Sequence, residues 1–216
     1  MTLKPSALLA TFAASILLLA ASPPAPNEAP FTTNAAYRQL VKNWAGIKTL
    51  SSDIAVQTKP QGFLPISLTL RGHTYFEAPD KFTTVFEDVP GLLKKMVAER
   101  PSIAPPQAWP DVYDGTIVSD EGGKSTIRLV PKDAESKLDH IDATVNDTTG
   151  FVEKYDFEGK NGAATTTYNI YTFVLGHALV SFQSGVARGH GYAADVTTSF
   201  SNYEINGRLP ADAFDK

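Results

Sequence analysis

The chain has 216 residues, of which 43% are hydrophobic, and it carries a formal net charge of −4 and no cysteine. This length and composition suit a single globular domain with a substantial core. The lack of cysteine excludes disulfides, thiolate metal ligands and a cysteine nucleophile. The mildly acidic charge argues against nucleic acid as a partner, because a nucleic-acid surface would need clustered Lys and Arg.

The first 21 residues have the pattern of a secretory signal peptide. Lys4 precedes an apolar run from Ala7 to Ala21, and the proline-rich stretch SPPAPNEAP follows. A short cationic start, an apolar core and small residues are typical of such peptides, whereas a membrane span needs roughly 20 apolar residues. We predict a signal peptide over residues 1–21, a linker over 22–31 and one domain over 32–216, with export to the periplasm or cell envelope. An uncleaved membrane anchor is the alternative.

The first element of the domain is predicted to be an amphipathic helix. Its apolar side chains recur at the i, i+3, i+4 and i+7 spacing of one helix face, at Tyr37, Leu40, Val41 and Trp44. Thr33 or Asn34 can cap the start of this helix, and Gly46 can end it. Such a helix needs an apolar surface to lie on.

Most of the remaining chain is predicted to form strands rich in β-branched and aromatic residues. The ten stretches are 52–59, 66–79, 81–88, 111–120, 125–132, 140–147, 151–159, 165–176, 177–186 and 195–206. The alternation is clearest in the third stretch, where Phe82, Thr84 and Phe86 share one face. Glycine-containing turns of the hairpin type connect many of the later strands. The predicted fold class is therefore mainly β (α+β), with an antiparallel sheet and few helices.

The segment from Val89 to Pro110 interrupts the strand pattern. Its first half predicts a short helix with one apolar side, made of Leu92, Leu93, Met96 and Val97. Its second half is rich in proline and cannot join a central strand, because proline lacks the donor that the sheet ladder needs. We predict that this segment is a lid over the concave face of the sheet. A fixed cover that never opens is the alternative.

The stretch GGKST at residues 122–126 resembles the end of a nucleotide-binding loop, but its surroundings do not fit one. Such a loop needs a glycine five positions before the Gly-Lys pair and a helix after it. Val118 occupies the first of these positions, and a predicted strand follows Lys124. We predict a hairpin tip and no bound nucleotide, since the helix N-terminus that would hold phosphate is missing.

The polar residues give no strong catalytic or metal-binding pattern. The four histidines are not spaced as metal ligands, so we predict no metal and no other cofactor. Ser181 and Ser184 lie near His177 but outside a Gly-x-Ser-x-Gly turn. A catalytic triad assembled from distant residues stays open.

Glu153 is the carboxylate with the most unusual surroundings in the pattern. It shares strand parity with Tyr155 and Phe157, which predicts an apolar face. It therefore either lies on that face with a raised pKa or lies at the rim of the sheet.

The stretch 165–176 carries large apolar side chains on both strand parities. An antiparallel sheet with one wet face should not need this, and two predicted helices offer little cover for so many strands. We infer that one face lines an internal hydrophobic cavity. The predicted lining consists of Phe76, Phe82, Phe86, Ile127, Leu129, Tyr155, Phe157 and Tyr168. An ordinary packed core is the alternative, because large apolar strand residues are usually buried.

Two short motifs occur in a defined order along the chain. The first is Pro79-x-x-Phe82, within GHTYFEAPDKFTTVF, and the second reads Asn-x-x-Leu-Pro-x-x-x-Phe over residues 206–214. With the exported start and the first helix, they make residues 35–215 resemble the LolA/LppX-like superfamily of bacterial envelope lipoprotein and lipid carriers. The resemblance implies an unclosed antiparallel β-barrel with helices on its concave side. It also implies an apolar cavity for acyl chains, no metal, nucleotide or cofactor, and no catalysis.

The chain departs from this superfamily at two places. Ala78 stands where the lipoprotein carriers have an arginine, and the segment 89–110 replaces an Asp-Gly pair followed by an aromatic strand. We therefore expect a divergent, non-enzymatic carrier or binder of a lipid or an acylated protein. One alternative is an envelope interaction or sensor module that uses the same fold against a membrane-associated partner. Another is an envelope hydrolase.

Overall fold

The computed structural model describes residues 30–61, 67–87, 89, 103–189 and 191–215. The predicted signal peptide and most of the predicted linker lie outside these ranges. Phe31, predicted to be the last linker residue, is buried in the core, so the folded part includes it. No helix within the described ranges is long and apolar enough to cross a membrane.

The predicted amphipathic helix is present as α1 (Ala35–Asn43). Asn34 caps it, because its side-chain oxygen accepts from the backbone N–H of Ala36 at 2.8 Å and of Tyr37 at 3.2 Å. Gly46, with φ of +85°, lies in the turn after the helix. The predicted cap at Asn34 is thereby confirmed, whereas the helix ends at Asn43 with Trp44 as its C-cap, two residues before Gly46.

Within the described residues, the shorter helical segments are η1 (Phe31–Thr33), η3 (Pro106–Ala108) and α3 (Trp109–Val112). η3 and α3 displace the start of the strand predicted at 111–120. Their prolines occupy first-turn positions, where a missing N–H breaks no helical hydrogen bond. The Tyr37 hydroxyl donates to the Pro106 carbonyl oxygen at 3.0 Å, and burial raises the pKa of Tyr37 to about 12. This uncharged contact holds α1 against η3.

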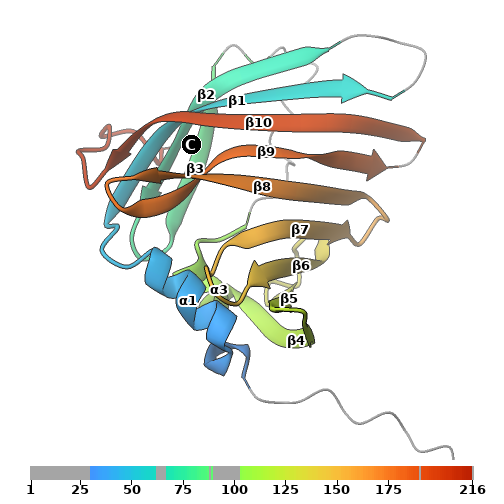
Figure 1. Cartoon of the computed structure of the whole chain (residues 1–216). Coiled ribbons are helices and arrows are strands. Elements are labelled where there is room, and N and C mark those ends of the chain that lie inside the picture. Colours follow the sequence, from blue (N-terminus) through green and yellow to red (C-terminus); the bar gives the residue numbers. More distant parts are fainter. Residues whose placement is uncertain (1–29, 62–66, 88, 90–102, 190, 216) are drawn as a thin grey trace, which may run out of the picture.

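All ten predicted strands are present and form one antiparallel sheet, with few helices beside it (Figure 1). The strands are β1 (Thr49–Pro60), β2 (Leu68–Glu77), β3 (Lys81–Phe86), β4 (Tyr113–Glu121), β5 (Lys124–Pro131), β6 (Leu138–Asn146), β7 (Val152–Gly159), β8 (Ala164–Val174), β9 (His177–Gly189) and β10 (Tyr192–Ile205). Their order is β3-β2-β1-β10-β9-β8-β7-β6-β5-β4. The end strands β3 and β4 do not pair with each other within the described ranges, so the sheet is an unclosed barrel.

The GGKST stretch forms the tip of the β4–β5 hairpin. Glu121 pairs with Lys124, which leaves Gly122 and Gly123 as the turn. Both glycines have positive φ, at +63° and +76°. These values suit the tight turns that connect twisted antiparallel strands, and the predicted hairpin tip is confirmed.

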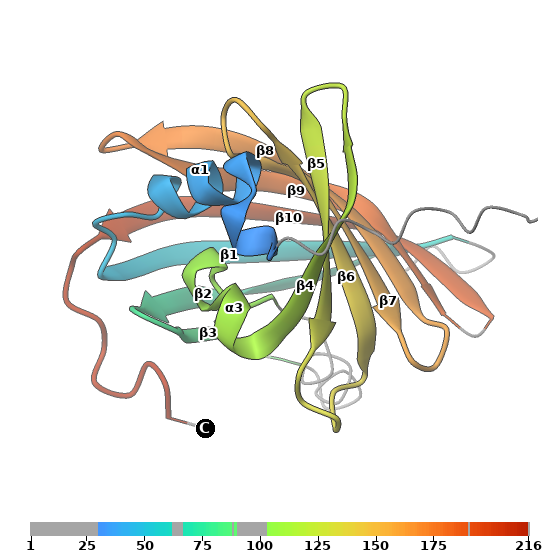
Figure 2. The ribbon, with the colours of Figure 1, turned by 90° about the horizontal axis from the view of Figure 1, so that it is seen from below.

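The sheet curves around α1. The larger core cluster packs α1 and η1 against β4 to β7, and the smaller one contains Phe76 of β2 and Leu179 of β9. Trp44, at the C-terminal end of α1, packs against both clusters, and its ring lies 5.4 Å from that of Phe76. α1 contacts β6, and Trp44 at its end packs on Phe76 of β2; because β2 and β6 are far apart in the strand order, the sheet must bend for both contacts to form (Figure 2). We call the sheet face that carries α1 the inner face.

Candidate functional site

The first group of predicted cavity residues, Phe76, Phe82 and Phe86, lies on the inner face of β2 and β3. Phe76 pairs directly with Phe82, and Gly72, of the same parity as Phe76, pairs with Phe86. Directly paired residues of antiparallel strands point to the same face. Phe76 is 1% exposed and packs on Trp44, whereas Phe82 is 42% exposed and Phe86 is half-buried. We call these three residues the first wall.

The second group lies on β5 and β7 and consists of Ile127, Leu129, Tyr155 and Phe157. β6 lies between these strands, and its core residue Ile141 pairs with Leu129 on one side and Phe157 on the other. Ile127 and Leu129 are fully buried in the core, while Tyr155 and Phe157 are half-buried and pack on it with ring centroids 5.7 Å apart. Burial raises the pKa of Tyr155 well above its usual value, so its phenol is neutral. We call these four residues the second wall.

Between the two walls the inner face carries short side chains. One row of directly paired residues runs from β8 to β1 through Thr167, Gly185, Val196 and Thr58. A neighbouring row runs through Thr165, Ala187, Ala194 and Pro60. Tyr155 pairs with Thr167 and Phe157 with Thr165, so both rows continue the second wall. We call these eight residues the floor; the sequence did not reveal it, because the pairing of β8 to β1 is needed to align the rows.

Tyr168, the eighth predicted cavity residue, lies on the opposite face of the sheet. It is adjacent in sequence to the floor residue Thr167, and it pairs with Lys154 and Ser184. Its side chain is 54% exposed, and Ile170 on the same strand is 58% exposed. The structure therefore separates Tyr168 from the other seven residues. The large side chains of Tyr168 and Ile170 therefore lie on an exposed outer face of this strand. They do not indicate that a second face of the sheet is covered.

The predicted lid residues Leu92, Leu93, Met96 and Val97 lie outside the described residues, and the lid stays a prediction. The cavities of the described part of the chain include one of about 600 Å³ and one of about 380 Å³. Neither is lined by any of the eight predicted cavity residues. The predicted acyl-chain site also stays a prediction.

Glu153 differs from its predicted environment. The pairing of β6 with β7 shifts between Thr144 and Val145, which makes Glu153 an extra residue in a β-bulge. Because of the bulge, the Glu153 side chain does not have to lie on the apolar face that carries Tyr155 and Phe157. The carboxylate pairs with Lys124 at 2.5 Å and accepts from the Asn146 amide at 3.0 Å. The ion pair with Lys124 lowers the pKa of Glu153, so the prediction of a raised pKa is wrong.

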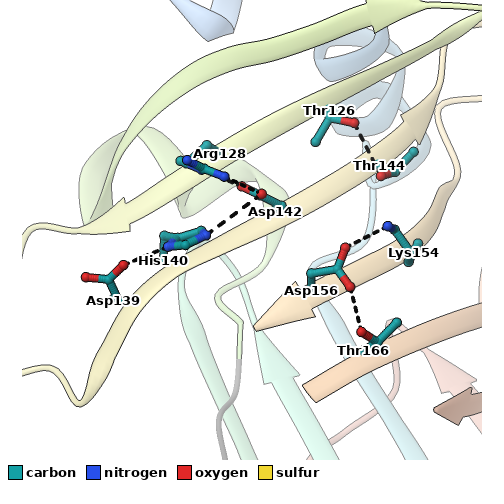
Figure 3. Close-up of polar contacts among 9 residues, drawn as sticks. All are labelled: Thr126, Arg128, Asp139, His140, Asp142, Thr144, Lys154, Asp156 and Thr166. Carbon is teal, nitrogen blue, oxygen red and sulfur yellow. Dashed lines mark hydrogen bonds and ion pairs between the residues drawn. The ribbon is translucent and has the colours of Figure 1, made fainter. Parts of the chain in front are cut away.

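The outer face of β5 to β8 carries a polar network beneath the larger cavity (Figure 3). Arg128 donates to both carboxylate oxygens of Asp142, at 2.8 and 2.7 Å, and Lys154 pairs with Asp156 at 2.7 Å. His140 lies 3.8 Å from Asp142. These contacts match cations with carboxylates, which is the pattern of a solvated sheet face rather than of an activated nucleophile.

Ser181 and His177, considered above as candidate catalytic residues, each contact a backbone carbonyl group and not each other. The Ser181 hydroxyl donates to the Ile170 carbonyl oxygen at 3.3 Å, and His177 Nδ1 lies 3.4 Å from the Asn43 carbonyl oxygen. Neither contact has the hydroxyl-to-imidazole geometry that activates a nucleophile. Within the described ranges, no group of three or more His, Asp or Glu is placed to hold a metal ion.

Comparison with known proteins shows the fold. The chain is similar to a solved DUF1329 family protein from Desulfovibrio piger, with a TM-score of 0.62 at 13% identity over 84% of this chain and 96% of that one. It is similar to a LolA superfamily protein from Nitrosomonas europaea, with a TM-score of 0.55 at 10% identity over 84% and 96%.

A putative outer membrane lipoprotein-sorting protein domain from Vibrio parahaemolyticus gives a TM-score of 0.61 at 13% identity, over 83% of this chain and 94% of that one. No family model and no curated protein matches the chain. The predicted resemblance is confirmed at the level of structure: the chain has a LolA-like fold.

Proposed function

We propose that this protein is an exported, non-enzymatic carrier that binds the acyl chain of a lipid or a lipoprotein on the inner face of its sheet. The observation that carries the proposal is the inner face itself, where a floor of short side chains lies between two walls of large apolar ones. Phe82, Phe86, Tyr155 and Phe157 keep accessible surface on the walls. An extended hydrocarbon chain is the ligand that such an arrangement suits best.

The energetics are adequate for a carrier that must also release its cargo. Apolar surface removed from water contributes about 25 cal/mol per Å², so an acyl chain that buries a few hundred Å² gains several kcal/mol. Association costs offset a large part of this gain, which favours reversible binding over permanent retention of the cargo. Two of the similar structures are a LolA superfamily protein and a putative outer membrane lipoprotein-sorting protein domain, which agrees with this class of cargo.

Organic extraction of the purified protein, followed by mass spectrometry of the extract, tests the proposal. We expect a lipid or fatty acid in near-stoichiometric amount. A clean extract, together with no binding of added fatty acid, would contradict the carrier function. Capture of one specific protein under those conditions would favour the interaction module, and turnover of ester or glycoside substrates would favour the hydrolase.

A further inference from the structure

The turn between β8 and β9 holds a leucine where the backbone favours glycine or asparagine. The two strands pair as far as Val174 and His177, so the turn consists of Leu175 and Gly176. Their φ angles are +50° and +83°, as in the two-residue turns of tight hairpins, for which Asn-Gly is the preferred sequence. A leucine in this conformation is uncommon because its side chain crowds the backbone.

In the described fold, burial of the leucine side chain does not offset the cost of this backbone conformation. The Leu175 side chain is 83% exposed, and that of the neighbouring Phe173 is 70% exposed. These are the two highest exposures among the large apolar residues of the described part. Phe173 lies at the edge of an aromatic group, with its ring 6.2 Å from that of Phe151, which stacks on Tyr171 at 4.5 Å. The hairpin therefore presents an exposed apolar tip next to a group of packed aromatic rings.

A cavity that contains one cationic side chain adjoins this tip. The cavity of about 380 Å³ lies between the hairpin and the C-terminal end of α1, and it is lined by Lys42, Asn43, Ala45, Thr149, Phe151, Phe173, Gly176, His177 and Ala178. The lining contains no carboxylate, and Lys42 has no ion-pair partner within the described ranges. An apolar tip beside an unpaired cation is complementary to a lipid–water interface that carries anionic head groups.

We propose that the tip of the β8–β9 hairpin docks on an anionic membrane surface. Phe173 and Leu175 enter the boundary between head groups and acyl chains, and Lys42 lies against the head-group phosphates. An exposed apolar tip suits a bilayer, which yields to it, better than a folded partner, which would need a matching groove. This surface is distinct from the floor and walls proposed to bind cargo, and it would bring an envelope carrier to the membrane.

Binding of the full chain to vesicles of phosphatidylcholine, with and without phosphatidylglycerol, tests this docking. Leu175→Asn creates the favoured Asn-Gly turn, so the fold is kept while the apolar tip is lost. Combined with Phe173→Thr, it should lower partitioning onto the anionic vesicles by at least about tenfold, because two large apolar side chains no longer insert. Lys42→Gln should reduce binding to anionic vesicles and leave binding to neutral ones unchanged.

Ile170→Thr is the matched control, since Ile170 is 58% exposed on the same strand but lies away from the tip. Every variant keeps the same N-terminal segment, so differences in partitioning report the hairpin. The proposal would be overturned if the tip variants bound the anionic vesicles as well as the parent does. It would also be overturned if the parent bound vesicles equally well with and without phosphatidylglycerol. Cargo recovered by extraction should be equal in the parent and in Leu175→Asn, so a failure of docking and a failure of cargo binding are distinguishable.

Discussion

At the scale of single residues, Asn34 shows how one polar side chain positions the inner face. Its oxygen accepts from two backbone N–H groups of α1, and its amide donates to the buried Ser125 hydroxyl of β5 at 3.3 Å. The same side chain thus starts the helix and ties it to the sheet. The sequence predicted the cap, because Asn precedes the apolar pattern of a helix. It did not predict the tie to Ser125, which is 91 residues away along the chain.

Replacing this cap should weaken the fold measurably. Asn34→Ala removes the acceptor for two helix donors, and we expect it to cost about 1–2 kcal/mol of stability. Urea unfolding followed by circular dichroism measures the loss. Asn34→Ser keeps a capping oxygen and should recover most of the stability. An alanine variant as stable as the parent would show that the cap contributes little here.

Glu153 gives a prediction about pH. Because Lys124 lowers the pKa of Glu153 in the folded protein, the pair contributes stability at neutral pH that is lost as the pH falls through the folded-state pKa. Lys124→Gln should raise the pKa of Glu153 toward its usual value and reduce stability slightly at neutral pH, since both side chains are well exposed.

Carboxyl NMR titration of Glu153 and urea unfolding at neutral and acid pH measure these changes. The stability difference between Lys124→Gln and the parent should vanish once Glu153 is protonated. Lys59→Gln, at an exposed lysine of β1, is the control and should leave the Glu153 titration unchanged. A Glu153 titration that is the same in parent and Lys124→Gln would exclude the ion pair in solution.

At the scale of elements, periodicity predicted the strands but not their irregularities. The alternation of β3 was readable because its apolar positions recur at every second residue. The bulge at Glu153 was not, because an extra residue is defined only against the partner strand. Tyr168 shows the same limit, since alternation says that two faces exist but not which one carries α1.

Gly185 tests the close approach of β8 and β9 in the floor. A Cβ atom at this position would lie 1.8 Å from the Thr166 carbonyl oxygen, a contact that no side-chain rotation relieves. Gly185→Ala should therefore destabilise the protein by about 1–3 kcal/mol through backbone displacement. Ser184→Ala on the same strand is the control and should be nearly neutral. Thermal unfolding of both variants makes the comparison, and equal midpoints would contradict the tight approach.

At the scale of the whole molecule, the curved sheet brings two groups of apolar residues onto one surface. These are the first wall, on β2 and β3, and the second wall, on β5 and β7, which are far apart in the strand order. Seven of the eight residues that the sequence predicted as cavity lining share the inner face, because large apolar residues at alternate positions indicate one buried side. The sequence could not divide them into those buried in the core and those that keep accessible surface. That division depends on where α1 and its Trp44 lie across the curved sheet. The floor depends in the same way on long-range pairing.

Two aromatic residues on opposite faces of the sheet can show whether an acyl chain lies on the inner face. Phe82 and Tyr168 are similarly exposed, at 42% and 54%, but lie on opposite faces. Both alanine variants should remain folded, because truncation of a half-exposed ring costs less than the roughly 3–5 kcal/mol of a core Phe→Ala change. Thermal unfolding of each variant checks this first.

The decisive measurement is a titration of parent, Phe82→Ala and Tyr168→Ala with a fluorescent fatty acid. We expect Phe82→Ala to raise Kd by about tenfold, through the loss of apolar contact, and Tyr168→Ala to bind like the parent. An unchanged Kd for Phe82→Ala, or a Kd raised as much by Tyr168→Ala as by Phe82→Ala, would show that the acyl chain does not lie on the inner face.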